Sequence, residues 1–123
     1  MTSKNFEDLI QDQLILQAIQ DLGFKIPSDI QQQAIPEVLQ GKDLRASAQT
    51  GTGKTAAFML PALCRLLKKS STRGPRILVL VPTRELAMQV VEETTKLSRH
   101  LRHITSVFIC GGIPYHVQNR KLS

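Results

Sequence analysis

The chain has 123 residues and a mass of 13.7 kDa, which suits one compact domain and leaves too little length for two. Hydrophobic residues make up 41% of it and charged residues 21%, a balance that excludes a disordered or fibrous chain. With 4% aromatic residues and no tryptophan, the core must rest on aliphatic side chains.

Positive charge is concentrated in the second part of the chain. Residues 1–43 carry three basic and seven acidic residues, whereas residues 44–123 carry thirteen basic and three acidic ones, for a net charge of +6. A basic surface of this kind suits an anionic partner such as a nucleotide or a nucleic acid, although it also suits plain solubility. Composition alone leaves both interpretations open.

The cysteines and the first residues indicate the compartment. Cys64 and Cys110 lie 46 residues apart without a CxxC pair, so reduced, buried thiols are a simpler interpretation than a metal site. The polar first eight residues do not resemble a signal peptide, and the longest apolar run, residues 77–82, is too short to cross a membrane. We therefore expect a soluble, cytoplasmic protein without membrane contact.

The first part of the chain predicts two helices. Apolar residues recur at spacings of three and four over residues 9–22, which indicates an amphipathic helix that ends at Gly23. Ser28 can cap a second short helix that runs through Ala34. Pro36 is expected to break this helix, because proline lacks the backbone N–H that a helix interior requires.

A strand candidate and a longer helix follow. Residues 41–43 predict a turn, and residues 44–48 are a weak strand candidate, short and interrupted by polar side chains. After the glycines of residues 51–53, residues 54–67 predict a helix, although Pro61 must begin a turn or kink it.

The remainder of the chain alternates strand and helix candidates. Residues 68–75 predict a basic surface loop, and residues 76–82, which are apolar without a break after Arg76, fit a strand buried on both faces. Thr83 can cap a helix to about His100, and residues 106–110 are another buried-strand candidate. Such alternation predicts an α/β domain with a parallel sheet and flanking helices.

The segment between the first strand candidate and its helix carries the strongest chemical signal. Residues 48–55, Ala-Gln-Thr-Gly-Thr-Gly-Lys-Thr, match the phosphate-loop pattern except that Ala48 replaces the first glycine. Glycines let backbone N–H groups turn toward phosphate oxygens, and the helix start adds partial positive charge. Lys54 would meet the β and γ phosphates, and the Thr55 hydroxyl would ligate Mg²⁺. The alternative is a glycine-rich turn that binds no ligand. The position of residues 48–55 between a predicted strand and a predicted helix argues against this alternative.

The parts that would hydrolyse a nucleotide are missing from the sequence. Phosphate-loop enzymes use a carboxylate at the end of an apolar strand to hold Mg²⁺. Both apolar strand candidates end without an acid, and the acids after Lys54 all fall in a predicted helix: Glu85, Glu92 and Glu93. The chain alone is therefore expected to bind a nucleotide without cleaving it.

Four motifs together resemble the DEAD-box family of ATP-dependent RNA helicases, and the resemblance covers the chain from Phe6 to its end. Phe6 lies seventeen residues before Gly23, where the family has an isolated aromatic residue. The matching segments are residues 23–36 (the Q motif), 48–55 (motif I), 82–87 (motif Ia) and 111–112 (the double glycine).

The resemblance implies a site for ATP and Mg²⁺. Gln31 would hydrogen-bond the adenine edge, since an amide that donates and accepts can exclude guanine, and Phe6 would stack on the adenine face. Lys54 and Thr55 would be the catalytic residues, with Thr55 also the metal ligand. The residues implied to bind the nucleotide are Phe6, Gln31, Ala48, Gln49, Thr50, Gly51, Thr52, Gly53, Lys54 and Thr55.

The resemblance also implies that RNA phosphates are held, without reading of sequence, by Thr83, Arg84, Gly111 and Gly112. Taken singly, each implied site residue has a simpler explanation, such as an exposed helix position, a terminal hydrophobic contact, a surface charge or a turn. Their occurrence together in one family pattern favours the functional interpretation.

In the family's terms, residues 1–123 form the N-terminal part of a RecA-like, P-loop NTPase domain. The Asp-Glu-Ala-Asp segment, the Ser-Ala-Thr segment and the second domain are absent from this sequence. The full-length protein would couple ATP hydrolysis to local RNA unwinding. The alternatives are a stand-alone nucleotide- or RNA-binding module without catalysis, and an interaction protein whose phosphate loop is unused.

The resemblance also bears on stability. The family's sheet places other strands between those formed by residues 44–48 and 76–82, and these strands are among the missing ones. Open sheet edges invite pairing with other chains. We therefore expect the chain alone to be marginally stable or to self-associate, and a cooperative, high-temperature melt of a strict monomer would contradict this.

Overall fold

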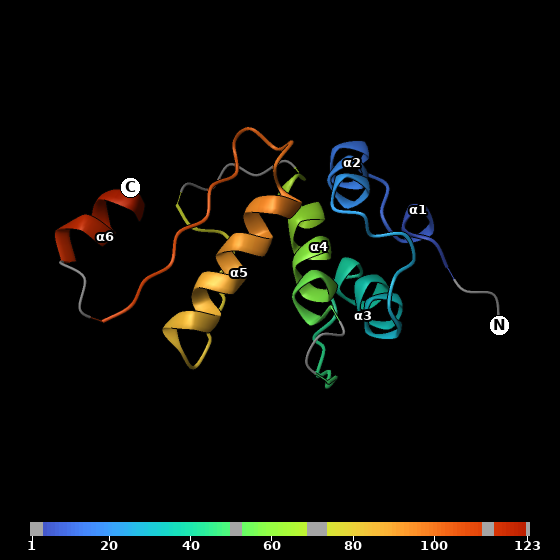
Figure 1. Ribbon diagram of the computed structural model, residues 1–123, viewed down its shortest axis with the longest axis horizontal. Coiled ribbons are helices and arrows are strands. Elements are labelled where there is room, and N and C mark those ends of the chain that lie inside the picture. The colour runs from blue at the N-terminus through green and yellow to red at the C-terminus, as the bar shows by residue number, and fades with distance from the viewer. Residues whose placement is uncertain (1–3, 50–52, 69–73, 112–114, 123) are drawn as a thin grey trace.

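The computed structural model describes residues 4–49, 53–68, 74–111 and 115–122, and all regular structure in these ranges is helical (Figure 1). The helices are α1 (Phe6–Leu9), α2 (Gln13–Asp21), α3 (Asp29–Leu39), α4 (Lys54–Leu66), α5 (Arg84–Leu97) and α6 (Tyr115–Leu122). Helices α1 to α4 pack together, α5 lies along α4, and α6 stands apart at the end of an irregular segment (Figure 1).

The helix predicted over residues 9–22 is confirmed over α2, but its start is wrong, because Leu9 ends the separate helix α1 and residues 10–12 lie between the two helices. Asp12 Oδ1 accepts hydrogen bonds from the backbone N–H groups of Leu14 and Ile15 at 2.9 and 3.0 Å. An aspartate that caps in this way starts a new helix at the following residue. The apolar periodicity marks the buried face of α2, and the Asp12 cap within the periodic stretch sets the residue at which the helix begins.

The expected break at Pro36 is also wrong. Ser28 caps α3 as predicted, since its Oγ accepts from the backbone N–H of Gln31 at 3.4 Å, but the helix continues through Pro36 to Leu39. The proline leaves the Gln32 carbonyl without its helical hydrogen bond. The buried side chains of α3, such as Ile35, keep the helix against α4, the neighbour with which it packs most extensively.

Helices α4 and α5 confirm the helices that the sequence predicts, but the turn expected at Pro61 does not form, because α4 is a single helix from Lys54 to Leu66. Helix α4 runs without interruption through the buried Pro61, and α5 begins after Thr83, whose Oγ1 accepts from the backbone N–H of Leu86 at 3.2 Å. Helix α5 ends at Leu97, about a turn earlier than expected. Helix α6 was not predicted, because its sequence lacks an apolar stripe.

The predicted parallel sheet does not form, so the described part of the chain is all-helical rather than α/β. Between described residues, no backbone hydrogen bond pairs residues 44–48, 76–82 or 106–110 with another segment. A β-strand is defined by the backbone hydrogen bonds that it forms with a neighbouring strand. The absence of strands is consistent with an incomplete domain.

The core is aliphatic, as the composition predicts. It is formed by side chains from α1 to α5, among them Ile15, Ile35, Leu60 and Leu97.

The described cysteines are both free. Burial, with a smaller contribution from the charge of Asp12, raises the pKa of Cys64 to about 11, so this thiol stays protonated at neutral pH. None of the described helices has the length and apolar character that crossing a membrane requires.

A charged cluster joins the end of α2 to the residues after α5. His100 Nε2 lies 2.7 Å from Asp21 Oδ2, and Arg99 Nη1 lies 3.8 Å from the same oxygen. Gln17 Nε2 donates to Asp21 Oδ1 at 3.0 Å. The hydrogen bonds from His100 and Gln17, with the charge of Arg99, lower the pKa of Asp21 below its ordinary value.

Replacing Asp21 with asparagine should therefore reduce the acid sensitivity of the fold. A lowered folded-state pKa contributes stability that is present above the ordinary value of 3.8 and is lost as the pH falls through the lower folded-state value. Because Asp21 is exposed to solvent, the change in melting temperature should be small. Melting temperatures compared between about pH 6 and pH 3 test this, with the exposed Asp43→Asn as control. Identical acid profiles for Asp21→Asn and the wild type would contradict it.

Candidate functional site

The amino end of α4 differs from those of the other long helices. Its cap residue is Gly53, with a left-handed backbone conformation at φ 83°, so it has no side chain to accept from the first-turn N–H groups. Helices α2, α3 and α5 are capped by the side chains of Asp12, Ser28 and Thr83. An uncapped helix start offers its N–H groups and dipole to an outside acceptor, and a phosphate suits both.

Of the predicted phosphate-binding residues, Gly53, Lys54 and Thr55 lie at this helix end. Lys54 is the first residue of α4 and is exposed, and no described carboxylate forms an ion pair with it. Thr55 follows, half-buried. Ala48 is half-buried and Gln49 exposed, whereas three predicted positions lie outside the described residues: Thr50, Gly51 and Thr52.

Gln31 connects the predicted Q motif to the predicted phosphate loop. Its side chain is 6% exposed, its Oε1 accepts from the backbone N–H of Ser28 at 2.9 Å, and its Nε2 donates to the carbonyl of Gly53 at 3.2 Å. An amide oxygen accepts two hydrogen bonds and an amide nitrogen donates two, so each atom keeps one further position. The sequence predicted both residues, and the hydrogen bond between them comes from the packing of α3 on α4.

The contact explains why position 53 is glycine. A Cβ there would overlap the amide nitrogen of Gln31, and a φ of 83° is already strained for any residue with a side chain. The close approach and the positive φ thus require glycine independently.

Phe6 is buried and is not exposed at this surface. It is 3% exposed and belongs to the core. The backbone N–H of nearby Lys4 donates to Gln32 Oε1 at 3.3 Å, and Gln32 Nε2 donates to the carbonyl of Pro27 at 2.9 Å, which holds the first residues against the start of α3. A buried ring offers no free face to a base in this conformation, so the stacking role of Phe6 stays a prediction.

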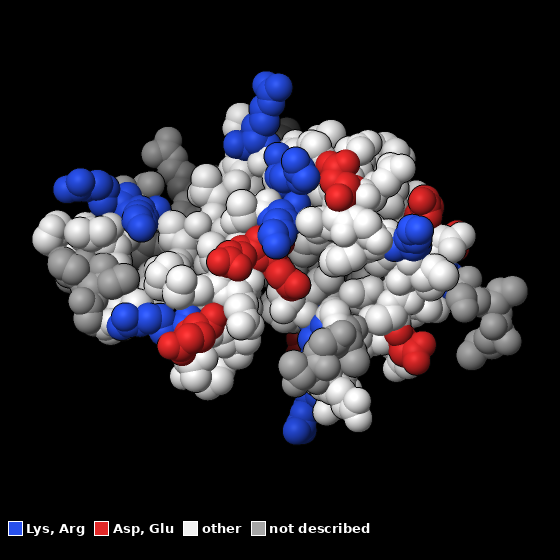
Figure 2. Space-filling model, in the orientation of Figure 1, with Lys and Arg blue, Asp and Glu red and all other residues white. Residues whose placement is uncertain are grey.

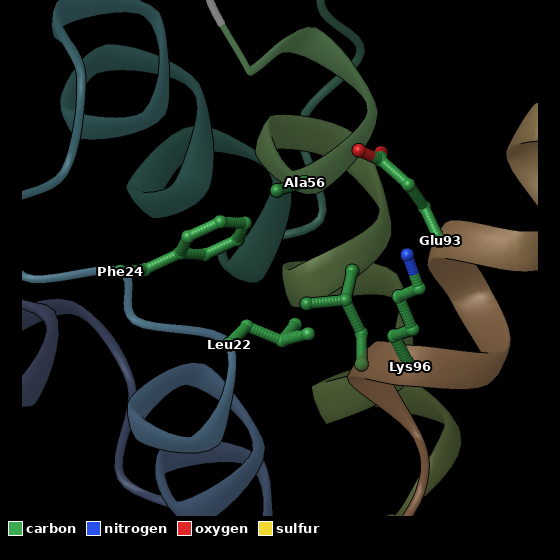
Figure 3. A pocket seen from close by; sticks show the side chains of 6 residues that line it. Leu22, Phe24, Ala56, Glu93 and Lys96 are labelled. Atoms are coloured by element: carbon green, nitrogen blue, oxygen red, sulfur yellow. The ribbon is translucent and has the colours of Figure 1, made fainter.

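Phe24 is the aromatic residue that the sequence interpretation missed. Its ring is 39% exposed and points toward the first turn of α4 (Figure 3). It lines a cavity of about 220 Å³ together with Leu22, Ala56, Glu93, Lys96 and Leu97. Cavities that enclose whole small ligands begin at roughly 300 Å³, so this one suits a part of a ligand. Only the difference in exposure separates Phe24 from Phe6, and sequence does not reveal it.

The predicted RNA-binding residues also come together. Arg84 Nη2 donates to the carbonyl of Gly111 at 2.6 Å, although 27 residues separate them, and Thr83 precedes Arg84 at the start of α5. The remaining N–H groups of the guanidinium can still donate to a phosphate. The fourth predicted residue, Gly112, lies outside the described residues.

Charge on the surface is mixed. Figure 2 shows basic side chains over α6 and over the C-terminal end of α5, with acidic side chains between them on the same face. The basic residues near these helix ends include Lys96, Arg120 and Lys121.

Within the described residues, no group of three or more potential metal ligands is found. The sequence predicts one Mg²⁺ ligand in this chain, the Thr55 hydroxyl, and Thr55 is the second residue of α4.

Comparison with known proteins decides the family. The family model described as DEAD/DEAH box helicase matches residues 28–123, which is more than half of the chain. The chain belongs to the DEAD/DEAH box helicase family. The resemblance seen in the motifs is thereby confirmed.

The relatives of this DEAD/DEAH box helicase chain are much longer than the chain itself. It is 50% identical over 117 residues to the ATP-dependent RNA helicase SrmB of Escherichia coli, a match that covers 94% of this chain and 26% of SrmB. It is equally similar to the ATP-dependent RNA helicase DeaD of the same organism, of which it covers 18%. The chain thus spans about a quarter or less of the relatives that it matches.

A solved structure supports the fold of the matched part. The crystal structure of the RNA helicase Prp28 from Chaetomium thermophilum, bound to ADP, matches 88% of this chain and 27% of that chain with a TM-score of 0.78 and 39% identity. The helices of this DEAD/DEAH box helicase chain are therefore arranged as in the RecA-like helicase domains, even though no strand forms in its described residues.

Proposed function

We propose that this chain carries the ATP-binding part, and part of the RNA-binding surface, of a DEAD-box ATP-dependent RNA helicase, as the N-terminal portion of its first domain. The hydrogen bond between Gln31 and Gly53 carries the proposal. It joins the residue that would identify the base to the loop that would hold the phosphates. Relatives at 50% identity are ATP-dependent RNA helicases, which supports the same assignment.

The phosphates of ATP would lie at the amino end of α4. The N–H groups of the loop and the first turn would donate to phosphate oxygens, and Lys54 would add a full positive charge. Thr55 would contribute its hydroxyl to the Mg²⁺ that accompanies ATP, and this ion would neutralise phosphate charge. The uncapped helix start and the exposed lysine fit a phosphate group.

The adenine would lie beside Gln31. The free acceptor and donor positions of its amide match the N–H and ring nitrogen that adenine presents, whereas guanine presents a different pattern. The exposed ring of Phe24, at the mouth of the cavity beside the first turn of α4, is better placed to stack on the base than the buried Phe6.

RNA would be held by its backbone. Thr83, Arg84 and Gly111 meet at the amino end of α5, and Gly112 follows in sequence. Contacts of this kind fix a strand without reading its bases. Helicase activity would require the carboxylates that this chain lacks, so hydrolysis and strand separation are assigned to the longer protein. A nucleotide- or RNA-binding module without catalysis is the alternative, and an Asp-Glu-Ala-Asp segment in the parent polypeptide would decide against it.

Thermal melting with nucleotides tests the base-reading role of Gln31. A ligand that binds only the folded chain raises its melting temperature, so Mg²⁺-ATP should raise it and Mg²⁺-GTP should raise it less. Gln31→Ala should reduce the difference between the two nucleotides severalfold. The neighbouring Gln33→Ala, an exposed position on the same helix, should leave the difference intact. Unchanged discrimination in Gln31→Ala would remove the adenine role from that residue.

A second pair of variants tests which aromatic residue stacks on the base. Phe24→Ala should lower ATP affinity about three- to tenfold, the loss expected for one stacking contact. Phe58→Ala is the control, because Phe58 is 38% exposed, nearly the same as Phe24, but lies on α4 outside the cavity. Titration of each variant with ATP gives the comparison. Equal affinities for the two variants would exclude Phe24 as the platform.

A further inference from the structure

The turn that follows α5 is basic and has no acidic residue of its own. Residues 94–123 contain five Lys and Arg residues and all three histidines of the chain, but no Asp or Glu. Four of these basic residues fall within five positions, in the sequence Arg-His-Leu-Arg-His of residues 99–103. They come directly after Ser98, the residue that ends α5. Neither the nucleotide site nor the contact between Arg84 and Gly111 uses this turn.

A hollow of about 400 Å³ lies beside the turn. Its volume falls within the range of sites for small ligands, which begins at roughly 300 Å³. Figure 2 shows basic side chains over this end of α5. The polar residues that line the hollow carry two guanidinium groups and four hydroxyls: Thr95, Ser98, Arg99, Arg102, Thr105 and Ser106. Phosphate oxygens accept hydrogen bonds and carry negative charge, so a phosphate group suits such a lining.

Several of these donors are unused. The hydroxyls of Thr95 and Ser98 donate to carbonyls one turn earlier in α5, at 2.8 and 2.7 Å. By contrast, the side chains of Arg102, Thr105 and Ser106 form no hydrogen bond or ion pair with any described residue. Their donors are therefore available to a ligand.

A simpler role for the arginines would be to cap the carboxyl end of α5, where a cation interacts favourably with the helix dipole. The backbone already satisfies this end. The carbonyls of Ser98 and Leu101 accept from the backbone N–H groups of Leu101 and Ile104 at 2.8 and 3.3 Å. Arg102 lies beyond the last turn of the helix, and the effect of the dipole is confined to that turn. Helix capping thus does not explain Arg102.

One carboxylate lies against the basic turn. Asp21 Oδ2 is 3.8 Å from Arg99 Nη1 and 2.7 Å from His100 Nε2. No carboxylate of the described residues forms an ion pair with Arg102. The charge of Arg99 is therefore partly balanced, and Arg102 attracts an anion more strongly.

We propose that the hollow beside the turn is a second contact for the RNA backbone, in which Arg102 and Arg99 hold phosphates without reading bases. The proposal rests on the RNA-binding role proposed above and extends it to the opposite end of α5. Arginine suits this role because its planar group can donate two hydrogen bonds to one phosphate.

The two RNA contacts are separate sites. Arg84 begins α5 and the hollow lies at the other end of this helix of 14 residues, which corresponds to about 20 Å. Exposed glutamates lie on α5 between the two ends, and their charge repels phosphates: Glu85, Glu92 and Glu93. The stretch of RNA in the hollow is therefore not the stretch that Arg84 holds.

Fluorescence anisotropy with a labelled oligouridylate of about 12 nucleotides tests the proposal. Replacing both Arg99 and Arg102 with alanine should lower RNA affinity about tenfold. It should also reduce the slope of log affinity against log salt by about 1.4, the value for two lost phosphate contacts on a single strand. The matched control replaces Arg45 and Arg65, two exposed arginines elsewhere, and should stay within about twofold of the wild type. Circular dichroism verifies that the helices persist in each variant.

A variant at Asp21 tests the same site in the opposite direction. Asp21→Asn removes the carboxylate beside Arg99, so it should raise RNA affinity about two- to fivefold. This gain should disappear when Arg99→Ala is combined with it. Asp43→Asn, at an exposed aspartate, changes the net charge equally and should give a smaller gain. Equal gains in the two aspartate variants would contradict a site at the hollow.

The remaining outcomes separate the hollow from the other RNA contact. Loss of affinity and of salt slope in the Arg99 and Arg102 variant, with the control intact, would support the proposal. Equal losses in the two double variants, or no loss in either, would overturn it. Polyglutamate that binds as tightly as RNA and depends on the same two arginines would overturn it in favour of an acidic protein partner.

Arg84→Ala, measured beside these variants, shows which proposal fails. If Arg84→Ala weakens RNA binding and the Arg99 and Arg102 variant does not, the function proposed above stands and the hollow is not an RNA contact. If only the Arg99 and Arg102 variant weakens binding, the hollow stands and the role of Arg84 is wrong. Failure of the wild-type chain to bind RNA would overturn both RNA contacts and leave the nucleotide site unaffected.

Discussion

Replacement of Lys54 by alanine should remove most of the stabilisation that Mg²⁺-ATP gives to this chain. The side chain stands at the amino end of α4, exposed and without a described ion-pair partner, so its charge is available to a phosphate. A hydrogen bond to a charged group contributes about 1.5–3 kcal/mol, which corresponds to a loss of roughly 10- to 150-fold in ATP affinity. Calorimetric titration and the shift in melting temperature with ATP both measure it.

Lys68 offers a matched control at the other end of the same helix. It is exposed and lies just beyond the end of α4, so Lys68→Ala removes the same charge from the far end of the helix. If the positive charge of the chain attracted ATP only in a general way, the two variants would lose similar affinity. Equal losses in Lys54→Ala and Lys68→Ala would therefore contradict a phosphate site at the start of α4.

The parts of this site that sequence predicts are those that depend on neighbours in the chain. Adjacent residues in the sequence predict the glycine that precedes Lys54 and Thr55 at the start of α4. They also predict the helix caps Ser28 and Thr83, and the structure has all of these where they are expected. Local hydrogen-bonding chemistry decides such features. The hydrogen bond between Gln31 and Gly53 spans 22 residues, and only the packing of α3 on α4 creates it.

The parts that sequence does not predict depend on packing. Pro36 was expected to end a helix, but the burial of Ile35 against neighbouring helices outweighs the lost hydrogen bond. Phe6 and Phe24 are the same residue type near the same motif, and only the assembled core shows that one is buried and the other exposed. The strand candidates fail for a different reason. Their composition is that of buried strands, and the partners that would convert them into a sheet are not among the described residues.

Gly53→Ala should be the most damaging single substitution at the site. It forces a side chain into a backbone conformation at φ 83° and against the amide of Gln31. Left-handed backbone strain alone costs about 1–2 kcal/mol of folding stability, and displacement of a buried amide adds to it. Gly74→Ala separates the two effects, because Gly74 has a nearly identical φ of 86° and no atom near the added carbon. Denaturant unfolding should show a loss in both variants, and a larger loss in Gly53→Ala.

The double variant identifies the cause of the difference. If the excess loss in Gly53→Ala comes from the contact with Gln31, then Gln31→Ala should relieve it, and the two substitutions together should cost less than the sum of their separate effects by about 0.5–3 kcal/mol. The same variants should show that ATP affinity falls in Gly53→Ala but not in Gly74→Ala. Strict additivity in unfolding would mean that Gln31 and Gly53 do not act on each other. The proposal that Gln31 and the phosphate loop are energetically coupled would then be wrong, even if each of them bound its own part of the nucleotide.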